Sequence, residues 1–197
     1  MTDIFSGEEN KKVVLSDKKT RDFIELLKKR TVYQIDGSDI KESCTAALLL
    51  LFSAIDSLSK LTCNEEQYAT YLGSERRQGC NVRFIGFLNE FMRDKYSEYS
   101  DDIWQLRNDI VHTAISKKVS LSKNEKDTKH LEKENGILLF NTNQFLVDMD
   151  KVINELQNNP SFIENAKKRL GAFNLIDIRK EDNEYGPTPA ADSDIFQ

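Results

Sequence analysis

The sequence predicts a mainly α-helical fold, an up-and-down bundle of four to six helices with a small β-hairpin after the fourth helix. Only 8 glycines and 3 prolines occur among the 197 residues, which disfavours a turn-rich β-sandwich. Charged residues make up 31% of the chain and hydrophobic residues 39%, as in charge-rich globular helical proteins. Apolar residues recur at helical spacing along several segments. A chain of this length fits one domain with one core.

The two ends of the chain differ from its middle in composition. Residues 1–18 are polar and charged without a sustained period, so we expect a flexible N-terminus. Residues 173–197 form a C-terminal tail that combines acidic residues with two prolines, and we expect disorder after about residue 181. Residues 19–172 remain as one helical domain.

Two helices are predicted in the first third of the chain. Asp17 is a candidate cap for an amphipathic helix that runs through Leu27 and is interrupted by Gly37. Residues 39–61 are apolar on nearly every side in their middle, which is expected of a helix surrounded by other helices. We therefore expect residues 39–61 to form the central helix of the bundle.

A charged linker at 63–78 leads into the middle of the chain. Apolar residues then predict a helix over 81–95, and a fourth helix over 101–115 starts with acidic residues that suit a helix N-terminus. Residues 118–121 and 136–140 are short β-prone runs, which predict the small hairpin or flap.

Two further helices complete the predicted domain. Residues 143–156 return to helical spacing, and Pro160 is expected to break that helix. A last short helix over 162–170 should be ended by Gly171.

Charge, cysteine content and hydropathy limit the functional classes. The net charge of -5 and the pI near 5.2 argue against a protein that coats nucleic acid or an anionic membrane through its overall field. Cys44, Cys63 and Cys80 form no C-x-x-C pair and suggest reduced thiols rather than disulfides or zinc. The N-terminus lacks the layout of a signal peptide, and the apolar run at 45–55 is too short to span a bilayer. We expect a cytoplasmic protein with no membrane partner.

Common catalytic motifs are missing from the sequence. It contains no phosphate-binding glycine loop, no dinucleotide fingerprint, no nucleophile elbow and no H-E-x-x-H pair. We therefore expect no cofactor and no metal. His112 and His130 are the two histidines, and His130 lies in the charged segment 122–135, where we expect a solvated side chain without a role.

The predicted fourth helix places a cation among apolar residues. At about 100° per residue, one arc of this helix holds Ile103, Trp104, Leu106, Ile110, Val111 and Ala114. Arg107 projects from within this arc, where a cation needs a carboxylate, an exposed edge or an anion in a cleft. Asp56 interrupts the apolar central helix, so a pair between Asp56 and Arg107 would satisfy both charges.

Asn108 and His112 lie four residues apart, along one edge of the same helix. Residues 107–112 read RNDIVH, and this segment resembles the signature of the HEPN superfamily of helical-bundle proteins, an arginine followed after four to six residues by a histidine. The asparagine after the arginine, the apolar residues before the histidine, and the upstream ALLLLFSAIDSLSKL and RFIGFLNEFM segments add to the resemblance. It covers roughly residues 40–160.

The resemblance implies a metal-independent endoribonuclease. Attack of a ribose 2′-hydroxyl on the adjacent phosphate would leave a 2′,3′-cyclic phosphate. Arg107 would hold the phosphate, His112 would transfer protons because imidazole titrates nearest neutrality, and Asn108 would orient one of them. The resemblance also implies a homodimer through the helix carrying Arg107 and His112, and a defence or toxin-antitoxin setting with an inhibitory partner protein.

Several alternatives remain open from the sequence. Arg76, Arg77 and Arg83, beside Tyr68 and Tyr71, are candidates for guiding RNA, but arginines in a charged linker are commonly just solvated.

Two other hypotheses explain the Arg107 to His112 segment. In the first, Asp56 and Arg107 form a buried pair that serves stability alone, and His112 packs at its edge. Alternatively, the chain is a non-catalytic HEPN-like module that binds nucleotides, RNA or a protein.

Overall fold

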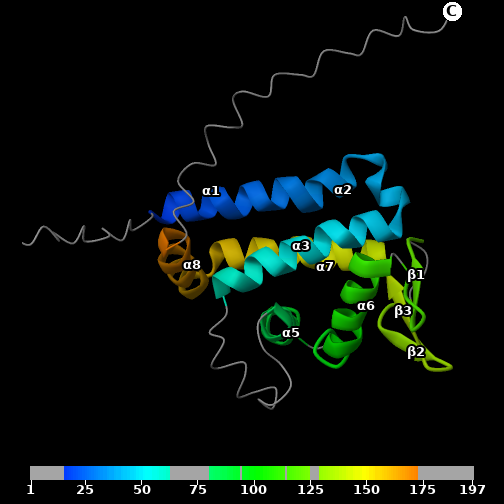
Figure 1. Cartoon of the computed structure of the whole chain (residues 1–197). Coiled ribbons are helices and arrows are strands. Elements are labelled where there is room, and N and C mark those ends of the chain that lie inside the picture. Colours follow the sequence, from blue (N-terminus) through cyan, green and yellow to red (C-terminus); the bar gives the residue numbers. More distant parts are fainter. Residues whose placement is uncertain (1–15, 63–79, 94, 114, 125–128, 173–197) are drawn as a thin grey trace, which may run out of the picture.

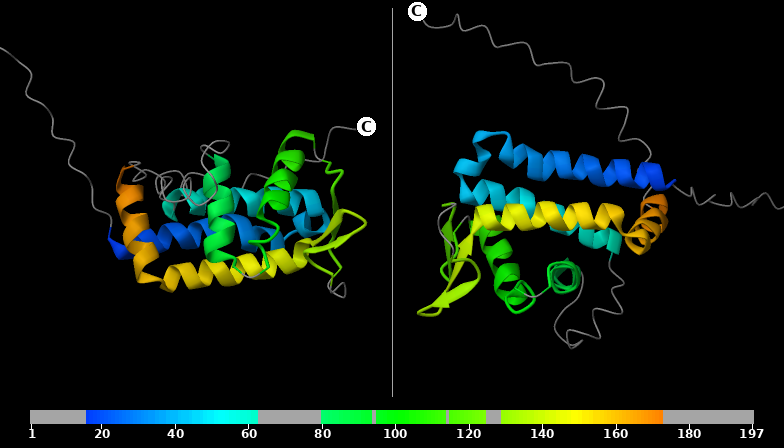
Figure 2. Two further views of the ribbon diagram at one scale, coloured as in Figure 1. Left: turned by 90° about the horizontal axis from the view of Figure 1, so that it is seen from below. Right: turned by 180° about the vertical axis from the view of Figure 1, so that it is seen from behind.

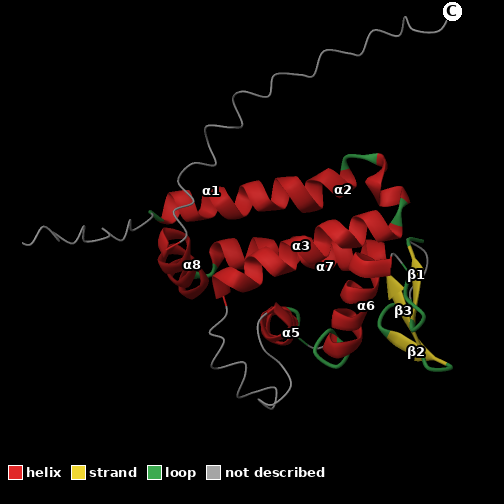
Figure 3. Cartoon of the chain, viewed as in Figure 1, coloured by secondary structure: helices red, strands yellow, loops and turns green. Residues whose placement is uncertain are grey.

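The computed structural model describes residues 16–62, 80–93, 95–113, 115–124 and 129–172. Helices dominate this part of the chain, and a small sheet lies at one end (Figures 1 and 3), which confirms the predicted mainly α-helical class. In chain order the elements are α1 (Asp17–Lys28), the π-helical turn η1 (Lys29–Tyr33), α2 (Gln34–Asp36), the 3₁₀ turn η2 (Asp39–Glu42), α3 (Cys44–Thr62), α5 (Cys80–Phe91), α6 (Ser100–Thr113), β1 (Val119–Ser122), β2 (Glu132–Glu134), β3 (Ile137–Asn141), α7 (Thr142–Asn158) and α8 (Pro160–Ala172). The predicted linker at 63–78 and most of both predicted tails lie outside the described residues.

The long helices α1, α3 and α7 run side by side, whereas α5, α6 and α8 lie across them (Figures 1 and 2). Helix α3 contacts α5, α6, α7 and α8, so it occupies the middle of the fold as the sequence predicts. Helix α1 runs opposite to α3 and α7, which share one direction, while the crossing helices cover the core from one side and from the end (Figure 1).

Helix α3 is the hub of the hydrophobic core. Leu48, Leu51, Phe52, Ile55 and Leu58 are at most 1% exposed, because apolar residues occur on most sides of this helix. By length and composition alone it is also long and apolar enough to cross a membrane, and it is the one such helix among the described residues. Half of that span is buried inside the fold.

The cap of the first helix lies one residue earlier than predicted. The Ser16 side chain accepts a hydrogen bond from the Lys19 backbone N–H at 3.3 Å, so Ser16 is the cap and Asp17 is the first helical residue. The helical path continues through η1 and α2 and ends at Gly37, whose N–H donates to the Tyr33 carbonyl oxygen at 2.9 Å. The interruption at Gly37 is as predicted.

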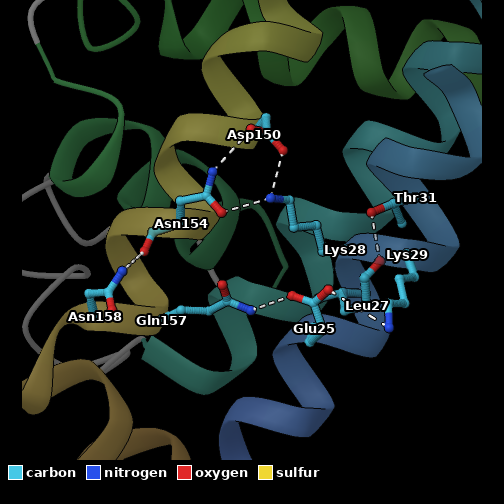
Figure 4. Close-up of polar contacts among 9 residues, drawn as sticks. All are labelled: Glu25, Leu27, Lys28, Lys29, Thr31, Asp150, Asn154, Gln157 and Asn158. Atoms are coloured by element: carbon cyan, nitrogen blue, oxygen red, sulfur yellow. Dashed lines mark hydrogen bonds and ion pairs between the residues drawn. The ribbon is translucent and has the colours of Figure 1, made fainter.

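A buried lysine fastens α1 to α7 (Figure 4). Lys28 is 3% exposed, its Nζ lies 2.8 Å from Asp150 Oδ1, and it donates to Asn154 Oδ1 at 2.7 Å. One turn away, Gln157 Nε2 donates to Glu25 Oε2 at 2.9 Å. A buried ammonium is tolerated only with such partners, so this contact fixes how the two helices pack.

The sheet is present, but its pairing differs from the predicted hairpin. Its order is β1-β3-β2, and β1 pairs with β3 in parallel, with Val119 opposite Leu138. The hairpin is instead formed by β2 and β3, joined by Asn135 and Gly136 at φ 51° and 79°. Positive φ at both central residues is typical of a type I′ turn, for which Asn-Gly is a strong sequence signal.

Helix α8 starts earlier than predicted, at Pro160 rather than at residue 162. Proline suits the first helical position because the N–H that it lacks would have no partner in the helix. Asn159 supplies the cap, since its side chain accepts from the Phe162 N–H at 3.1 Å. The helix then runs through Gly171 to Ala172, so Gly171 lies in its last turn instead of ending it.

Candidate functional site

Helix α6 lies between the core and solvent, in contact with α3 and α5. Its inward side carries Ile103, Leu106 and Ile110, which are at most 3% exposed. Trp104 is half-buried at the border of this side, and Val111 is 45% exposed. The predicted apolar arc is therefore wider than the part of it that the fold covers.

Arg107 lies at this border and is held from three directions. Its Nη2 donates to Asp56 Oδ2 of α3 at 2.9 Å, which is the pair expected from the sequence. Its Nη1 donates to Asn108 Oδ1 at 3.2 Å, and its Cζ lies 5.1 Å from the centre of the Trp104 ring. A guanidinium with these contacts has little freedom to reorient.

The ion pair is only partly removed from water. The side chain of Arg107 is 20% exposed and that of Asp56 is 25% exposed. Arg107 Nε is the exception, since it is buried and has no hydrogen-bond partner within the described part of the chain. The pair therefore presents a hydrated edge to solvent, where an incoming anion could meet the guanidinium.

His112 is exposed and stands apart from that pair. It makes no hydrogen bond or ion pair with any other described residue, and it lies one turn beyond Asn108 on α6. It follows Arg107 by five positions, which corresponds to about 140° around the helix axis. The structure thus brings Arg107, Asn108 and Asp56 together, but within one chain it does not bring His112 to Arg107.

The helices that carry Arg107 and Asp56 also carry exposed apolar side chains. Leu49 is 38% exposed and precedes Asp56 by seven residues on α3, so the two lie within about 20° of each other around that helix. Val111 follows Arg107 by one turn of α6, and Ile115, just beyond the helix, is 70% exposed. Leu49 and Val111 thus lie on the two helices that carry the pair, and Ile115 follows the end of α6.

The predicted RNA-guiding residues are only partly visible. Arg83 is half-buried on α5. Arg76, Arg77, Tyr68 and Tyr71 lie outside the described residues, so the structure does not test their role.

His130 contradicts the expectation of a solvated side chain. It is 8% exposed and is surrounded by partners that are remote in sequence. Its Nε2 lies 2.9 Å from Tyr96 Oη, and Tyr96 Oη donates to Asp148 Oδ2 at 2.9 Å. The Asn141 backbone N–H donates to His130 Nδ1 at 3.0 Å. The charged neighbours of His130 in sequence gave no sign of this buried network.

The partners of His130 define its protonation state. Since a backbone N–H can only donate, Nδ1 accepts, and the single ring proton sits on Nε2. The Nε2–H then donates to Tyr96 Oη, and the Tyr96 hydroxyl donates to Asp148. Burial lowers the pKa of His130 to about 4, although the Asp148 carboxylate opposes this shift. Burial and Asp148 raise the pKa of the Tyr96 hydroxyl, so both groups are neutral at pH 7.

Within the residues that the structure describes, no group of three or more His, Cys, Asp or Glu side chains is arranged to hold a metal ion. Cys44 is a free, half-buried thiol on α3. No protein-family model, curated protein or solved structure matches this chain. The functional assignment therefore rests on the side chains themselves.

Proposed function

We propose that the exposed face of α6 is the cleavage site of a metal-independent endoribonuclease of the HEPN type. The ribose 2′-hydroxyl attacks the adjacent phosphorus, the bond to the 5′-oxygen of the next nucleotide breaks, and the products carry 2′,3′-cyclic phosphate and 5′-hydroxyl ends. The observation that supports this proposal most is the position of the Arg107 guanidinium. Asp56 and Asn108 hold it at the solvent-exposed border of α6, the helix on which His112 is also exposed.

In this mechanism Arg107 binds the scissile phosphate. Its contacts with Asp56 and Trp104 fix the plane of the guanidinium before RNA arrives. A fixed cation favours the transition state, because negative charge grows on the phosphate oxygens as the pentacovalent geometry forms. The Asn108 carboxamide, already bonded to Nη1, then orients the guanidinium or a phosphate oxygen.

His112 transfers protons in the proposed reaction. It is exposed and keeps both ring nitrogens free of bonds to other described residues, as a proton-transfer group needs. Cleavage requires a base for the 2′-hydroxyl and an acid for the leaving 5′-oxygen, but one chain supplies one histidine on this face. His112 lies about 140° from Arg107 around the axis of α6. A second copy of the chain is therefore needed to place a histidine opposite an arginine across one cleft.

The proposal therefore includes a homodimer through α6. A second copy would cover the exposed apolar side chains of Leu49, Val111 and Ile115. Val111→Asp should break the dimer and abolish cleavage, whereas Val147→Asp, at an equally exposed valine on α7, should do neither. Wild type that is monomeric by light scattering at micromolar concentration would contradict this part of the proposal.

The cellular setting follows from the resemblance alone. An unrestrained endoribonuclease harms its own cell, so we place the protein in the cytoplasm under an inhibitory partner protein, in a defence or toxin-antitoxin role. RNA is the substrate, with no cofactor and no membrane involved.

The decisive experiment compares wild type with His112→Ala on a mixed RNA pool in EDTA, followed by analysis of the product ends. Glu155→Ala, an exposed change on α7, is the matched control. We expect 2′,3′-cyclic phosphate ends from wild type and the control, and no cleavage by His112→Ala. Equal cleavage by all three proteins would point to a contaminating nuclease and remove the support for the site.

The second candidate is a non-catalytic module of the same fold that binds RNA, a nucleotide or a protein. The observation in its favour is that Asp56 already neutralises part of the charge of Arg107, in a chain of net charge -5. This candidate predicts RNA binding that persists in His112→Ala, and no cleavage by either protein.

A further inference from the structure

Asn141, at the end of the central strand β3, joins three parts of the chain. Its side chain caps α7 by accepting from the Asn143 and Gln144 N–H groups at 3.0 and 3.1 Å. Its Nδ2 donates to the Asn124 carbonyl oxygen at 2.9 Å, and its own N–H donates to His130 Nδ1. Asn141 is 2% exposed, so the bond to the imidazole replaces one that water would otherwise make.

His130 begins the segment that crosses from this junction to α6. We call residues 129–136 the arm; it contains β2 and the turn into β3. At its far side, Lys133 Nζ lies 2.7 Å from Asp102 Oδ2, in the first turn of α6, and 5.6 Å from the centre of the Tyr99 ring. Besides the pairing of β2 with β3, the arm is thus attached to the β3–α7 junction through His130 and to α6 through Lys133.

We propose that His130 is an acid-operated latch, which holds the arm against the β3–α7 junction while its imidazole is neutral and releases the arm when its imidazole is protonated. This device stands apart from the proposed ribonuclease site, because neither the imidazole nor the junction contacts Arg107, Asn108 or His112 in any described hydrogen bond or ion pair.

The geometry of the latch explains why a proton opens it. A proton on Nδ1 would point at the Asn141 N–H, so the bond of 3.0 Å would become a contact between two donors. The imidazolium would also lie near Lys95, from the turn before α6, which repels it. Asp148 of α7 would attract it, but this carboxylate already accepts from Tyr96 and from Gln144 and lies 3.5 Å from Lys151 Nζ.

The backbone next to the latch stores strain that favours release. Leu131 has φ 58°, in the left-handed region that bulky side chains rarely adopt. Its side chain is 5% exposed, and its N–H donates to the Leu139 carbonyl oxygen at 2.8 Å. Such conformations persist only where surrounding contacts impose them, so loss of the Asn141–His130 bond removes one of the contacts that hold Leu131 in place.

The size of the effect follows from linkage between protonation and opening. An imidazole in the open arm titrates near 6.5, whereas the latched one titrates near 4. Protonation therefore favours opening below pH 6.5, and the equilibrium between latched and open arm should shift toward open by roughly 30-fold between pH 7.5 and pH 5. Below pH 4 the shift levels off, because both forms are then protonated.

Native-state amide hydrogen exchange of the full chain at pH 7.5 and pH 5 tests the latch. After correction for the intrinsic pH dependence of exchange, we expect the Asn141 and Leu131 amides to lose about 30-fold in protection relative to amides of α3. Equal protection ratios at the two pH values would overturn the proposal.

Two variants assign the effect to the correct histidine. His130→Asn keeps an acceptor for the Asn141 N–H but cannot titrate, so it should lose the pH dependence; His112→Asn should retain it. If His130→Asn retains the full loss of protection, the latch is wrong. Should His130→Asn fail to fold, NMR titration of wild type decides: arm amide shifts must follow the His130 ring, and shifts that follow His112, or no shifts, reject the latch.

Discussion

His112 and His130 place the same side chain in two contrasting environments. His112 is exposed on a regular helix and has no bonding partner among the described residues, whereas His130 is 8% exposed and has both ring nitrogens bonded. The buried ring accepts from Asn141 through one nitrogen and donates to Tyr96 through the other, so neither nitrogen is free to transfer a proton to a substrate. Partners and burial, rather than the presence of an imidazole, therefore decide whether a histidine is available for chemistry.

The largest expected effect is on the rate of RNA cleavage by variants of the two histidines. His112→Ala should reduce the cleavage rate by about 10² to 10⁴, the usual contribution of a proton-transfer group. His130→Asn should cleave at a wild-type rate at pH 7.5. Single-turnover rates on one labelled RNA provide the measurement. Equal losses in two folded variants would show that the division of roles between the histidines is wrong.

Substitution of His130 should lower the stability of the fold more than substitution of His112 does. His130→Ala removes a buried ring, leaves the Asn141 N–H without an acceptor and removes the donor to the Tyr96 oxygen, which should lower the free energy of unfolding by about 2 to 4 kcal/mol. His112→Ala should change it by less than about 0.5 kcal/mol, since the side chain is exposed. Urea unfolding at pH 7.5 compares the two. A larger loss in His112→Ala would reverse our assignment of the structural histidine.

Acid should destabilise wild type more than a variant in which residue 130 cannot titrate. The pKa of His130 is lowered in the folded state, so its contribution is complete above about pH 6.5 and is lost as the pH falls toward 4. Between pH 7.5 and pH 5, wild type should lose about 2 kcal/mol more unfolding free energy than His130→Asn does. Urea unfolding of both proteins at both pH values measures these losses. Subtracting one loss from the other cancels the contributions of the carboxylates that both proteins share. Equal losses would place the pKa of His130 near 6.5.

The smallest expected effect concerns the ion pair on the helix of His112. Arg107→Ala should lower the free energy of unfolding by about 1 to 2 kcal/mol, less than for a fully buried pair, because Asp56 is 25% exposed and water can solvate it. A double-mutant cycle with Asp56→Ala isolates the coupling between the two charges. A coupling of zero would mean that Asp56 does not hold Arg107 in place.

The sequence was sufficient where local pattern decides the structure. The apolar run of α3 identified the central helix, and two charges misplaced on apolar helices, Asp56 and Arg107, identified a contact across 51 residues. Helix starts were less accurate because caps depend on single side chains, as with Ser16 in place of Asp17.

The buried hydrogen-bond network of His130 could not be predicted from the residues next to it in the sequence. Tyr96 lies 34 residues before it, and Asp148 joins only through that tyrosine, so no local period connects the three. The sheet shows the same limit, because the parallel pairing of β1 with β3 depends on where α6 and α7 lie. Asn135-Gly136 did carry a local signal, and with it the β2–β3 hairpin was predictable in principle.

The contact of α1 with α7 and α8 has a consequence for synthesis on the ribosome. Lys28 and Asp17 find their partners Asp150 and Lys167 only when the last helices of the domain have been made. At translation rates of roughly 5 to 20 residues per second, the apolar sides of α1 and α3 wait on the order of ten seconds for those helices. The nascent chain should therefore bind cotranslational chaperones until α8 leaves the exit tunnel.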